Sequence, residues 1–134
     1  MATLTEDMKQ FINDNLAFVA TVSADGVPDL GPKMSMFALD DNHLAYHERT
    51  GGQTYRNLEN GSPLVVAFVN FAQKKGYRFR GEVVLHTDDA IYDEQVKLAE
   101  QRGTKKPACV PVMEIDQIED LSAGAHAGTT IAKD

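Results

Sequence analysis

The sequence contains few of the residues that stabilise extracellular domains or anchor a protein in a membrane. Cys109 is its only cysteine, so no internal disulfide can form. Its longest apolar run, Leu64 to Val69, is the size of a strand and much shorter than the ~20 apolar residues of a membrane span. Glu6, Asp7 and Asp14 lie where a signal peptide has a basic start and an apolar run. These absences predict a cytoplasmic protein without a membrane segment.

Basic residues are also in the minority. Lys and Arg number 13 against 20 Asp and Glu, which gives a net charge of -7 at pH 7. This charge opposes non-specific attraction to nucleic acid or to anionic lipid. The 134 residues, 43% of them hydrophobic, are enough for a single domain over residues 1–134, and no internal repeat divides it. Small molecules and other proteins remain as partners.

Two longer helices are expected, one near the N-terminus and one in the second half of the chain. Thr3 to Glu6 has the form of a capping box, and an apolar stripe at helical spacing follows it. Residues 90–102 carry a second such stripe, with Asp88 and Asp89 as candidate N-caps and Gly103 as the end. Helices are therefore predicted on both sides of the central part of the chain.

Short β-rich segments separated by turns fill the rest of the sequence. Six strands are expected, at residues 16–23, 27–39, 43–49, 64–71, 77–86 and 109–118. Asp25-Gly26 is a strong hairpin signal, and Gly31-Pro32 indicates a bulge or an edge position within the second strand. The tail from 122 to 134 is expected to be a loop. The pattern predicts a mainly β (α+β) fold, a six-stranded antiparallel barrel with flanking helices.

The most informative segment runs from His47 through two glycines to Leu58, with a short helix expected at 54–59. The free N–H groups at a helix start can hold a phosphate, and Gly51 and Gly52 allow the backbone to approach it. Hydroxyl groups or positive charge can come from Thr50, Thr54, Arg49 and Arg56. The alternative is that the glycines only turn the chain and Thr54 only caps the helix.

Two further segments have both a binding and a structural interpretation. Residues 29–36 combine a Gly-Pro pair with Lys33 and Ser35. This segment is either a strand that binds a flat ligand along its length or an edge strand with a bulge. A basic hairpin can steer an anionic substrate or form a solvated face. Its residues are Lys74, Lys75, Arg78 and Arg80.

No catalytic or metal-binding group is predicted. His43 and His47 are separated by roughly 13 Å of strand, too far to share a metal ion. Cys109, near Pro107 and Pro111, has the surroundings of a buried structural thiol, and His126 is expected to be exposed.

Several of these segments together resemble the FMN-binding split-barrel family related to pyridoxamine 5'-phosphate oxidase. The resemblance covers most of the chain and rests on residues 16–22 with Asp25-Gly26, 51–58, 78–83 and 124–128. The second segment is the most specific, because family members hold the FMN phosphate there. The resemblance implies a split barrel and a homodimer with FMN in the groove between subunits.

The resemblance also implies roles for individual residues. The phosphate and ribityl end would be held by Arg49, Thr50, Gln53 and Thr54, with Gly52 allowing close approach and Arg56 adding charge. The isoalloxazine ring would lie beside Pro32, Lys33, Met34 and Ser35. The basic hairpin and the tail near His126 are candidates for contacts to the partner subunit. A flavin needs no protein acid or base for hydride exchange, which agrees with the missing catalytic group.

The implied function is a small FMN-dependent oxidoreductase that takes electrons from a reduced nicotinamide. The chain has no Trp, whereas the vitamin-forming oxidase ends in a Trp- and Arg-rich motif that binds its substrate, so that reaction is not expected here. Gln53 stands where Lys or Arg is frequent. The alternatives are a non-enzymatic FMN-binding electron carrier, for which the acidic surface suits a basic redox partner, and a haem- or deazaflavin-binding barrel.

Overall fold

The computed structural model of the protein describes all residues from 1 to 134. The helices are α1 (Glu6–Asp14), α2 (Gln53–Glu59) and α3 (Ala90–Arg102). The strands are β1 (Ala17–Val22), β2 (Pro28–Lys33), β3 (Phe37–Asp40), β4 (His43–Ala45), β5 (Leu64–Asn70), β6 (Lys75–His86), β7 (Val110–Asp120) and β8 (Thr130–Lys133). No helix is both long and apolar enough to cross a membrane.

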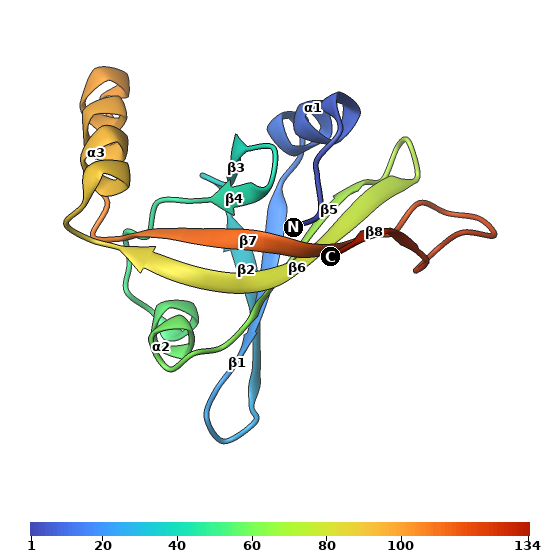
Figure 1. The fold of residues 1–134 in the computed structure, drawn as a ribbon, viewed down its shortest axis with the longest axis horizontal. Coiled ribbons are helices and arrows are strands. Elements are labelled where there is room, and N and C mark those ends of the chain that lie inside the picture. Colours follow the sequence, from blue (N-terminus) through green and yellow to red (C-terminus); the bar gives the residue numbers. More distant parts are fainter.

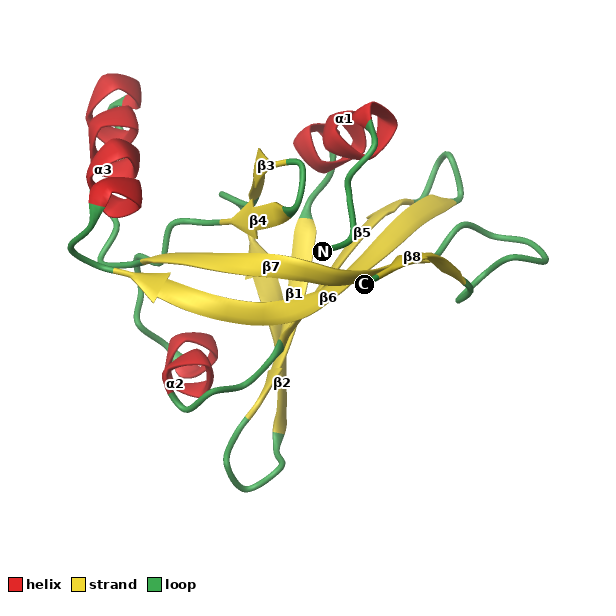
Figure 2. Ribbon diagram, in the orientation of Figure 1, coloured by secondary structure: helices red, strands yellow, loops and turns green.

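The strands form one antiparallel sheet that curls around the core without closing. The order across it is β2-β1-β5-β6-β7-β4-β3, and β8 pairs with β7 outside this path. Long β6 and β7 run side by side through the middle of the molecule, with α1 and α2 on opposite sides of them and α3 beyond one end (Figure 1). The secondary-structure colouring shows the three helices set around this sheet (Figure 2). The predicted mainly β fold is confirmed, with eight strands instead of six.

The first helix begins two residues later than the capping pattern predicts. Thr5, not Thr3, is the N-cap, and its side chain accepts a hydrogen bond from the Met8 N–H at 3.2 Å. The stripe of Met8, Phe11 and Ile12 is buried as helical spacing requires. The capping-box prediction therefore locates the helix but assigns the cap to the wrong threonine.

The second and third predicted strands are each interrupted. Residues 27–39 divide into β2 and β3, because the chain turns at 34–36 and not at the Gly31-Pro32 pair. Pro32 pairs with Phe18 in an edge strand, where a missing N–H costs no sheet hydrogen bond. Strand β4 ends at Ala45, although Glu48 still makes an isolated bridge to Cys109.

The tail is not entirely a loop, as the sequence predicts, but contains β8. This strand pairs with β7 through Gln117 with Lys133 and Ile118 with Ala132. Its own residues are mostly exposed, so there is no alternation of buried side chains to reveal it in the sequence. Backbone pairing with the free edge of β7 makes this segment a strand.

The main hydrophobic core lies inside the curl of the sheet under α1. Its largest fully buried apolar side chains are Tyr46, Phe68, Phe79, Ile12, Leu44, Leu64, Met113, Ile115 and Ile118. Helix α3 lies outside this core and covers a smaller apolar cluster at the far end of β7, formed by Ala45, Val110 and Val112. Helix α3 therefore lies next to β4, on the side away from the main core.

Two residues of the basic hairpin, Arg78 and Arg80, form ion pairs within the protein. Arg78 contacts both oxygens of the Glu119 carboxylate, at 2.8 Å and 3.0 Å, and Arg80 contacts it at 2.6 Å. The hydrogen bonds from Arg78 are the main cause that lowers the pKa of Glu119 from 4.5 to about 2, against burial and with help from Arg80. Two of the four basic side chains are thus already paired.

Glu119→Gln is expected to lower the free energy of unfolding at pH 7 by about 1–3 kcal/mol. Because the folded-state pKa is depressed, this stabilisation is complete above the ordinary value of 4.5 and is lost as the pH falls toward about 2. Urea unfolding from pH 7 to pH 2 should show the difference between wild type and variant shrinking with acid. Glu82→Gln, on an exposed side chain of β6 without an ion pair, is the control. A difference that stays constant with pH would contradict the ion-pair origin.

Candidate functional site

The segment after β4, residues 46–49, divides the predicted site residues between two sides of the chain. Its backbone bonds to the 109–111 segment at alternate residues, so successive side chains point in opposite directions. On one side, the Lys33 ammonium lies 5.1 Å from the Tyr46 ring centroid and 3.3 Å from Glu48 Oε1. On the other side, His47 and Arg49 line a cavity.

This cavity lies between the 46–49 segment, the connection from β2 to β3, and helix α3. Its volume of about 630 Å³ is within the range of small-molecule sites. The apolar part of its lining is Met34, Met36, Phe37, Leu39 and Leu98. The polar part is Asn13, Ser35, His47, Arg49, Glu94, Gln95, Arg102 and Thr104. Such a lining suits a flat, largely apolar ligand that a few polar groups orient.

Two nitrogen atoms of cavity-lining residues are buried without a hydrogen-bond partner, Nδ1 of His47 and Nε of Arg49. His47 Nε2 lies 2.9 Å from Gln95 Oε1, and an amide oxygen only accepts, so in the neutral imidazole Nε2 carries the proton and Nδ1 is an acceptor. Arg49 Nε can only donate. The Ser35 hydroxyl holds this strand in place by accepting from the His47 backbone N–H at 3.0 Å. Both nitrogens are buried, so His47 and Arg49 face the cavity through their other atoms, and a ligand in the cavity contacts these nitrogens only if the two side chains move.

The other side of the segment contains a buried carboxylate, Glu48, whose side chain is 1% exposed. Oxygen Oε2 accepts from the Thr50 N–H and the Gly51 N–H, both at 3.0 Å, and from the Thr50 hydroxyl at 3.1 Å. Oxygen Oε1 faces Lys33. Burial alone would raise the pKa of Glu48, but the Gly51 and Thr50 N–H groups and Lys33 outweigh burial and lower it. Glu48 is therefore an ionised carboxylate at neutral pH.

Helix α2 begins in the predicted place, with Gly52 as N-cap and no side-chain cap. The Thr54 hydroxyl donates to Asp29 Oδ2 at 3.0 Å, so Thr54 does not cap the helix. Gln53 donates to the buried Asn57 at 2.7 Å and accepts from Arg56 at 3.0 Å. Polar side chains of this helix are thus bound to one another, to Asp29 of β2 and to Thr21 of β1.

The ten predicted cofactor residues fall into four places. Met34, Ser35 and Arg49 line the cavity. Lys33 and Thr50 bind Glu48. Gly52, Gln53, Thr54 and Arg56 belong to α2 or its N-cap. Pro32 is exposed on the edge strand β2. The structure brings together only the first group around an open space. It adds His47, the first residue of the segment 47–58, and Gln95, which no sequence motif indicates.

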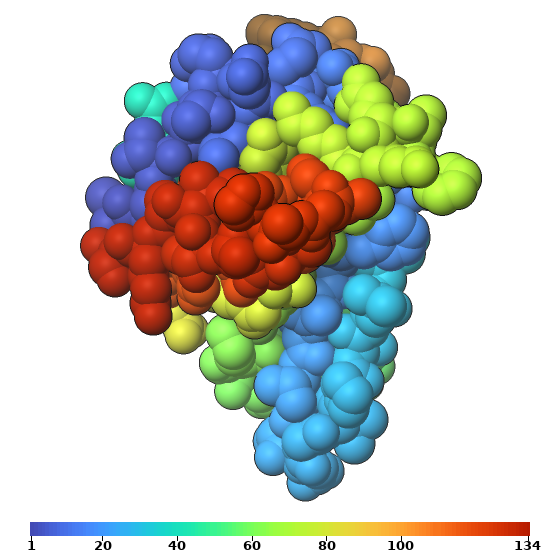
Figure 3. Space-filling view, turned by 90° about the vertical axis from the view of Figure 1, so that its right-hand side faces the viewer, coloured from blue at the N-terminus to red at the C-terminus, as the bar shows by residue number.

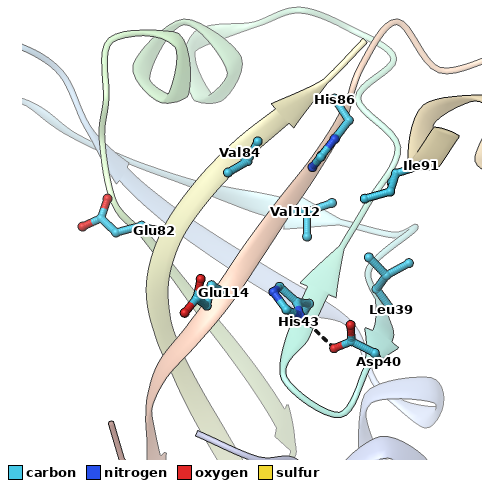
Figure 4. Close-up of a pocket in the computed structure, with 9 residues that line it drawn as sticks. All are labelled: Leu39, Asp40, His43, Glu82, Val84, His86, Ile91, Val112 and Glu114. Atoms are coloured by element: carbon cyan, nitrogen blue, oxygen red, sulfur yellow. Dashed lines mark hydrogen bonds and ion pairs between the residues drawn. The ribbon is translucent and has the colours of Figure 1, made fainter. Parts of the chain in front are cut away.

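A second cavity, of about 320 Å³, lies on β4, β6 and β7 beside the start of α3. Figure 4 shows His43 and His86 at this cavity with Val112 between them, and the dashed line joins His43 to Asp40. The Nδ1 atoms of the two imidazoles are bound to Asp40 at 2.8 Å and to Asp89 at 2.5 Å. None of the predicted cofactor residues lines it. His43 and His47 open into different cavities.

Two other candidate residues take the positions expected for structural or solvated groups. Cys109 is fully buried, and burial, the main cause, raises its pKa to about 11, which makes it a poor nucleophile. His126 is exposed in the loop before β8 and lines neither of these cavities.

The sequence profile of the pyridoxamine 5'-phosphate oxidase family matches residues 4–122. The chain belongs to this family. HupZ of Group A Streptococcus is 42% identical, with a TM-score of 0.84 over 93% of this chain and 99% of that one. A proposed pyridoxamine 5'-phosphate oxidase from Lactobacillus delbrueckii is 32% identical, with a TM-score of 0.76 over 87% and 93%. An FMN-binding protein from Syntrophomonas wolfei shares the fold at 17% identity, with a TM-score of 0.67 over 87% and 85%.

Membership of this family confirms the split-barrel fold.

The outer face of β1, β2 and β5 is apolar. The outward side chains there are all apolar: Phe18, Ala20, Val22, Pro28, Leu30, Pro32, Val65, Ala67 and Val69. Leu30 is 72% exposed and Phe18 45% exposed. The β1–β2 hairpin that carries most of this face extends beyond the rest of the molecule (Figure 3). An apolar surface of this extent is typical of a protein interface.

Proposed function

We propose that the protein is a homodimeric flavin-binding oxidoreductase of the pyridoxamine 5'-phosphate oxidase family, which uses FMN and takes electrons from a reduced nicotinamide. The isoalloxazine ring occupies the cavity between α3 and the 46–49 segment. Family membership supports a flavin, since a relative with the same fold is an FMN-binding protein. Met34, Ser35 and Arg49, expected near the cofactor, line this cavity.

The lining of the cavity carries the proposal, because it combines three residues expected near the cofactor, Met34, Ser35 and Arg49, with the imidazole of His47. The imide edge of an isoalloxazine ring has one N–H between two carbonyl oxygens, so it pairs with one acceptor and one donor. In this proposal the side chains of His47 and Arg49, whose Nδ1 and Nε atoms are buried without partners, turn toward the ring, so that His47 Nδ1 accepts and Arg49 Nε donates. Each of these nitrogens costs about 1–3 kcal/mol while it is buried and unpaired, and the movement that pairs both of them with the ring removes that cost.

The residues of the chain bind and orient the ring in this proposal. The apolar side chains around the cavity exclude water, and the permanent charge of Arg49 favours negative charge on the reduced ring. A bound flavin supplies the redox chemistry by accepting a hydride and passing its electrons on. The phosphate end fits less well, because the Thr50 and Gly51 donors expected to hold it are bound to Glu48.

The apolar outer face supports the homodimer. It extends across β2, β1 and β5 and is bounded on β6 by Arg78 and Arg80, which pair with Ala67 and Val65. A second copy of the chain would cover this face and the exposed edge of β2, whose backbone is otherwise free to pair wrongly.

A second candidate is an electron carrier that binds the same flavin but does not turn over nicotinamide. The net charge of -7 favours it, because an acidic surface suits docking to a basic redox protein. Stopped-flow mixing of the flavin-loaded protein with NADH and NADPH separates the two. Rapid loss of flavin absorbance supports the oxidoreductase, and no reaction with either nucleotide supports the carrier.

Arg49→Ala is expected to weaken riboflavin binding at least about tenfold, because it removes a charged donor to the ring. The measurement is quenching of flavin fluorescence as protein is added. Lys97→Ala, which removes one positive charge from the face of α3 away from the cavity, is the matched control and should bind as the wild type does. Equal affinity in all three proteins would place the ring elsewhere.

A further inference from the structure

We infer that Glu48 acts as an internal anion that takes the place of a ligand phosphate in the loop after β4, so the protein recognises the flavin ring and gains little from a terminal phosphate. This inference rests on the proposed flavin binding. It assigns Glu48 a role in ligand selection, which reduces the advantage of FMN over the unphosphorylated flavin.

The contacts of Glu48 are those that a bound phosphate would make. A phosphate in a glycine-containing loop is held by backbone N–H groups, a hydroxyl and a cation. Glu48 has all three: the N–H groups of Thr50 and Gly51, the Thr50 hydroxyl, and Lys33. Gly51 has a φ of 65°, a conformation that turns its N–H toward the carboxylate and that glycine adopts without strain. The donors of this loop are therefore satisfied before any ligand arrives.

Burial makes this carboxylate hard to displace. Its side chain is 1% exposed, and the chain around it is fixed by the bridge between Glu48 and Cys109. Moving it out would leave the Lys33 ammonium, itself 18% exposed, without its partner. A phosphate placed beside an ionised Glu48 would face a like charge in partly desolvated surroundings, where repulsion is strong. Both effects oppose phosphate binding here.

A second carboxylate stands at the other predicted phosphate contact. Asp29 is on the inward side of β2 and accepts from the Thr54 hydroxyl at 3.0 Å. The two hydroxyls expected to hold a phosphate, those of Thr50 and Thr54, thus each donate to a carboxylate of the chain. Carboxylates therefore oppose phosphate binding at two places, Glu48 in the loop after β4 and Asp29 beside helix α2.

The test compares FMN with riboflavin in wild type and in Glu48→Gln, by fluorescence titration of each flavin. Glutamine keeps one oxygen acceptor for the loop N–H groups and removes the charge. Wild type should bind FMN and riboflavin within about threefold of each other. Glu48→Gln should bind FMN about tenfold more tightly than wild type does, the size of one charge-assisted hydrogen bond, with riboflavin unchanged. If Glu48 only stabilised the fold, Glu48→Gln would change the affinities for FMN and for riboflavin by the same factor.

Two further variants keep the test decisive. Asp29→Asn should shift the FMN-to-riboflavin ratio in the same direction, which covers the case in which Glu48→Gln does not fold. Glu114→Gln, an exposed carboxylate at the second cavity, removes the same charge without touching the loop and should leave the ratio at the wild-type value. Wild-type FMN binding more than tenfold tighter than riboflavin, or variants without effect on the ratio, would overturn the inference.

Failure of the proposed function can be told apart from failure of this inference. If neither flavin binds to any of these proteins, the proposed function is wrong, and inorganic phosphate alone then decides the role of Glu48. Phosphate that raises the Tm of Glu48→Gln or Asp29→Asn but not of wild type supports the internal anion. An equal effect of phosphate on all proteins overturns it.

Discussion

Replacing Gly81 by alanine is expected to lower the free energy of unfolding by about 3 kcal/mol or more. Gly81 lies in β6 where the pairing with β7 shifts register after Arg80. A Cβ at this position would lie 1.8 Å from the backbone oxygen of Glu114 and 2.9 Å from its carbonyl carbon. The obstruction is backbone in the central strand pair, so it cannot rotate away as a side chain would. Urea unfolding followed by circular dichroism measures the loss.

Gly31→Ala is the matched control for this prediction. Gly31 is also a strand glycine in the same sheet, but a Cβ added there would meet no atom within 4 Å, and its φ is not positive. The substitution should leave stability unchanged or raise it slightly, since alanine restricts the unfolded chain. Equal destabilisation by both substitutions would show that the close approach at Gly81 is not the cause.

Leu30→Glu is expected to weaken the proposed homodimer by about 100-fold or more, because it places a charge in the middle of an apolar interface. Leu30 lies beside Ala20 on the outer face and is 72% exposed in the single chain, so the folded monomer should tolerate the change. Sedimentation equilibrium over a range of protein concentrations measures the dissociation constant.

The control for the interface is Val84→Glu. Val84 is 61% exposed but lies on β6 at the second cavity, away from the apolar face of β1, β2 and β5. It should leave the dimer intact. A wild-type protein that is monomeric at high concentration would contradict the homodimer, and dissociation by Val84→Glu with no effect of Leu30→Glu would place the interface near the end of β6, beside the second cavity.

The elements that can be predicted are those whose signals are local. Helix α3 has the predicted bounds, because Asp89 caps it and Gly103 ends it in the left-handed conformation, both next to the helix itself. The Asp25-Gly26 turn and the buried stripe of α1 are of the same kind. Strand β8 cannot be predicted in this way, since only its partner β7 makes it a strand.

The candidate site is predictable only in part for a related reason. The glycines and hydroxyls of residues 47–58 indicate a binding loop, but the sequence does not show that Glu48 and Asp29 take those hydroxyls. The alternation of 46–49, which sends Arg49 to the cavity and Glu48 to the loop, follows from a strand pattern. The pairing of His47 with Gln95 joins residues far apart in the chain and depends on the fold.

The measurement that tests the central proposal most directly is a titration of FMN fluorescence with the intact protein, followed by an absorption spectrum after removal of free flavin. The proposal predicts saturable quenching and retained flavin absorption bands, with both weakened in Arg49→Ala. No quenching at any protein concentration and a colourless protein after incubation with FMN would contradict it.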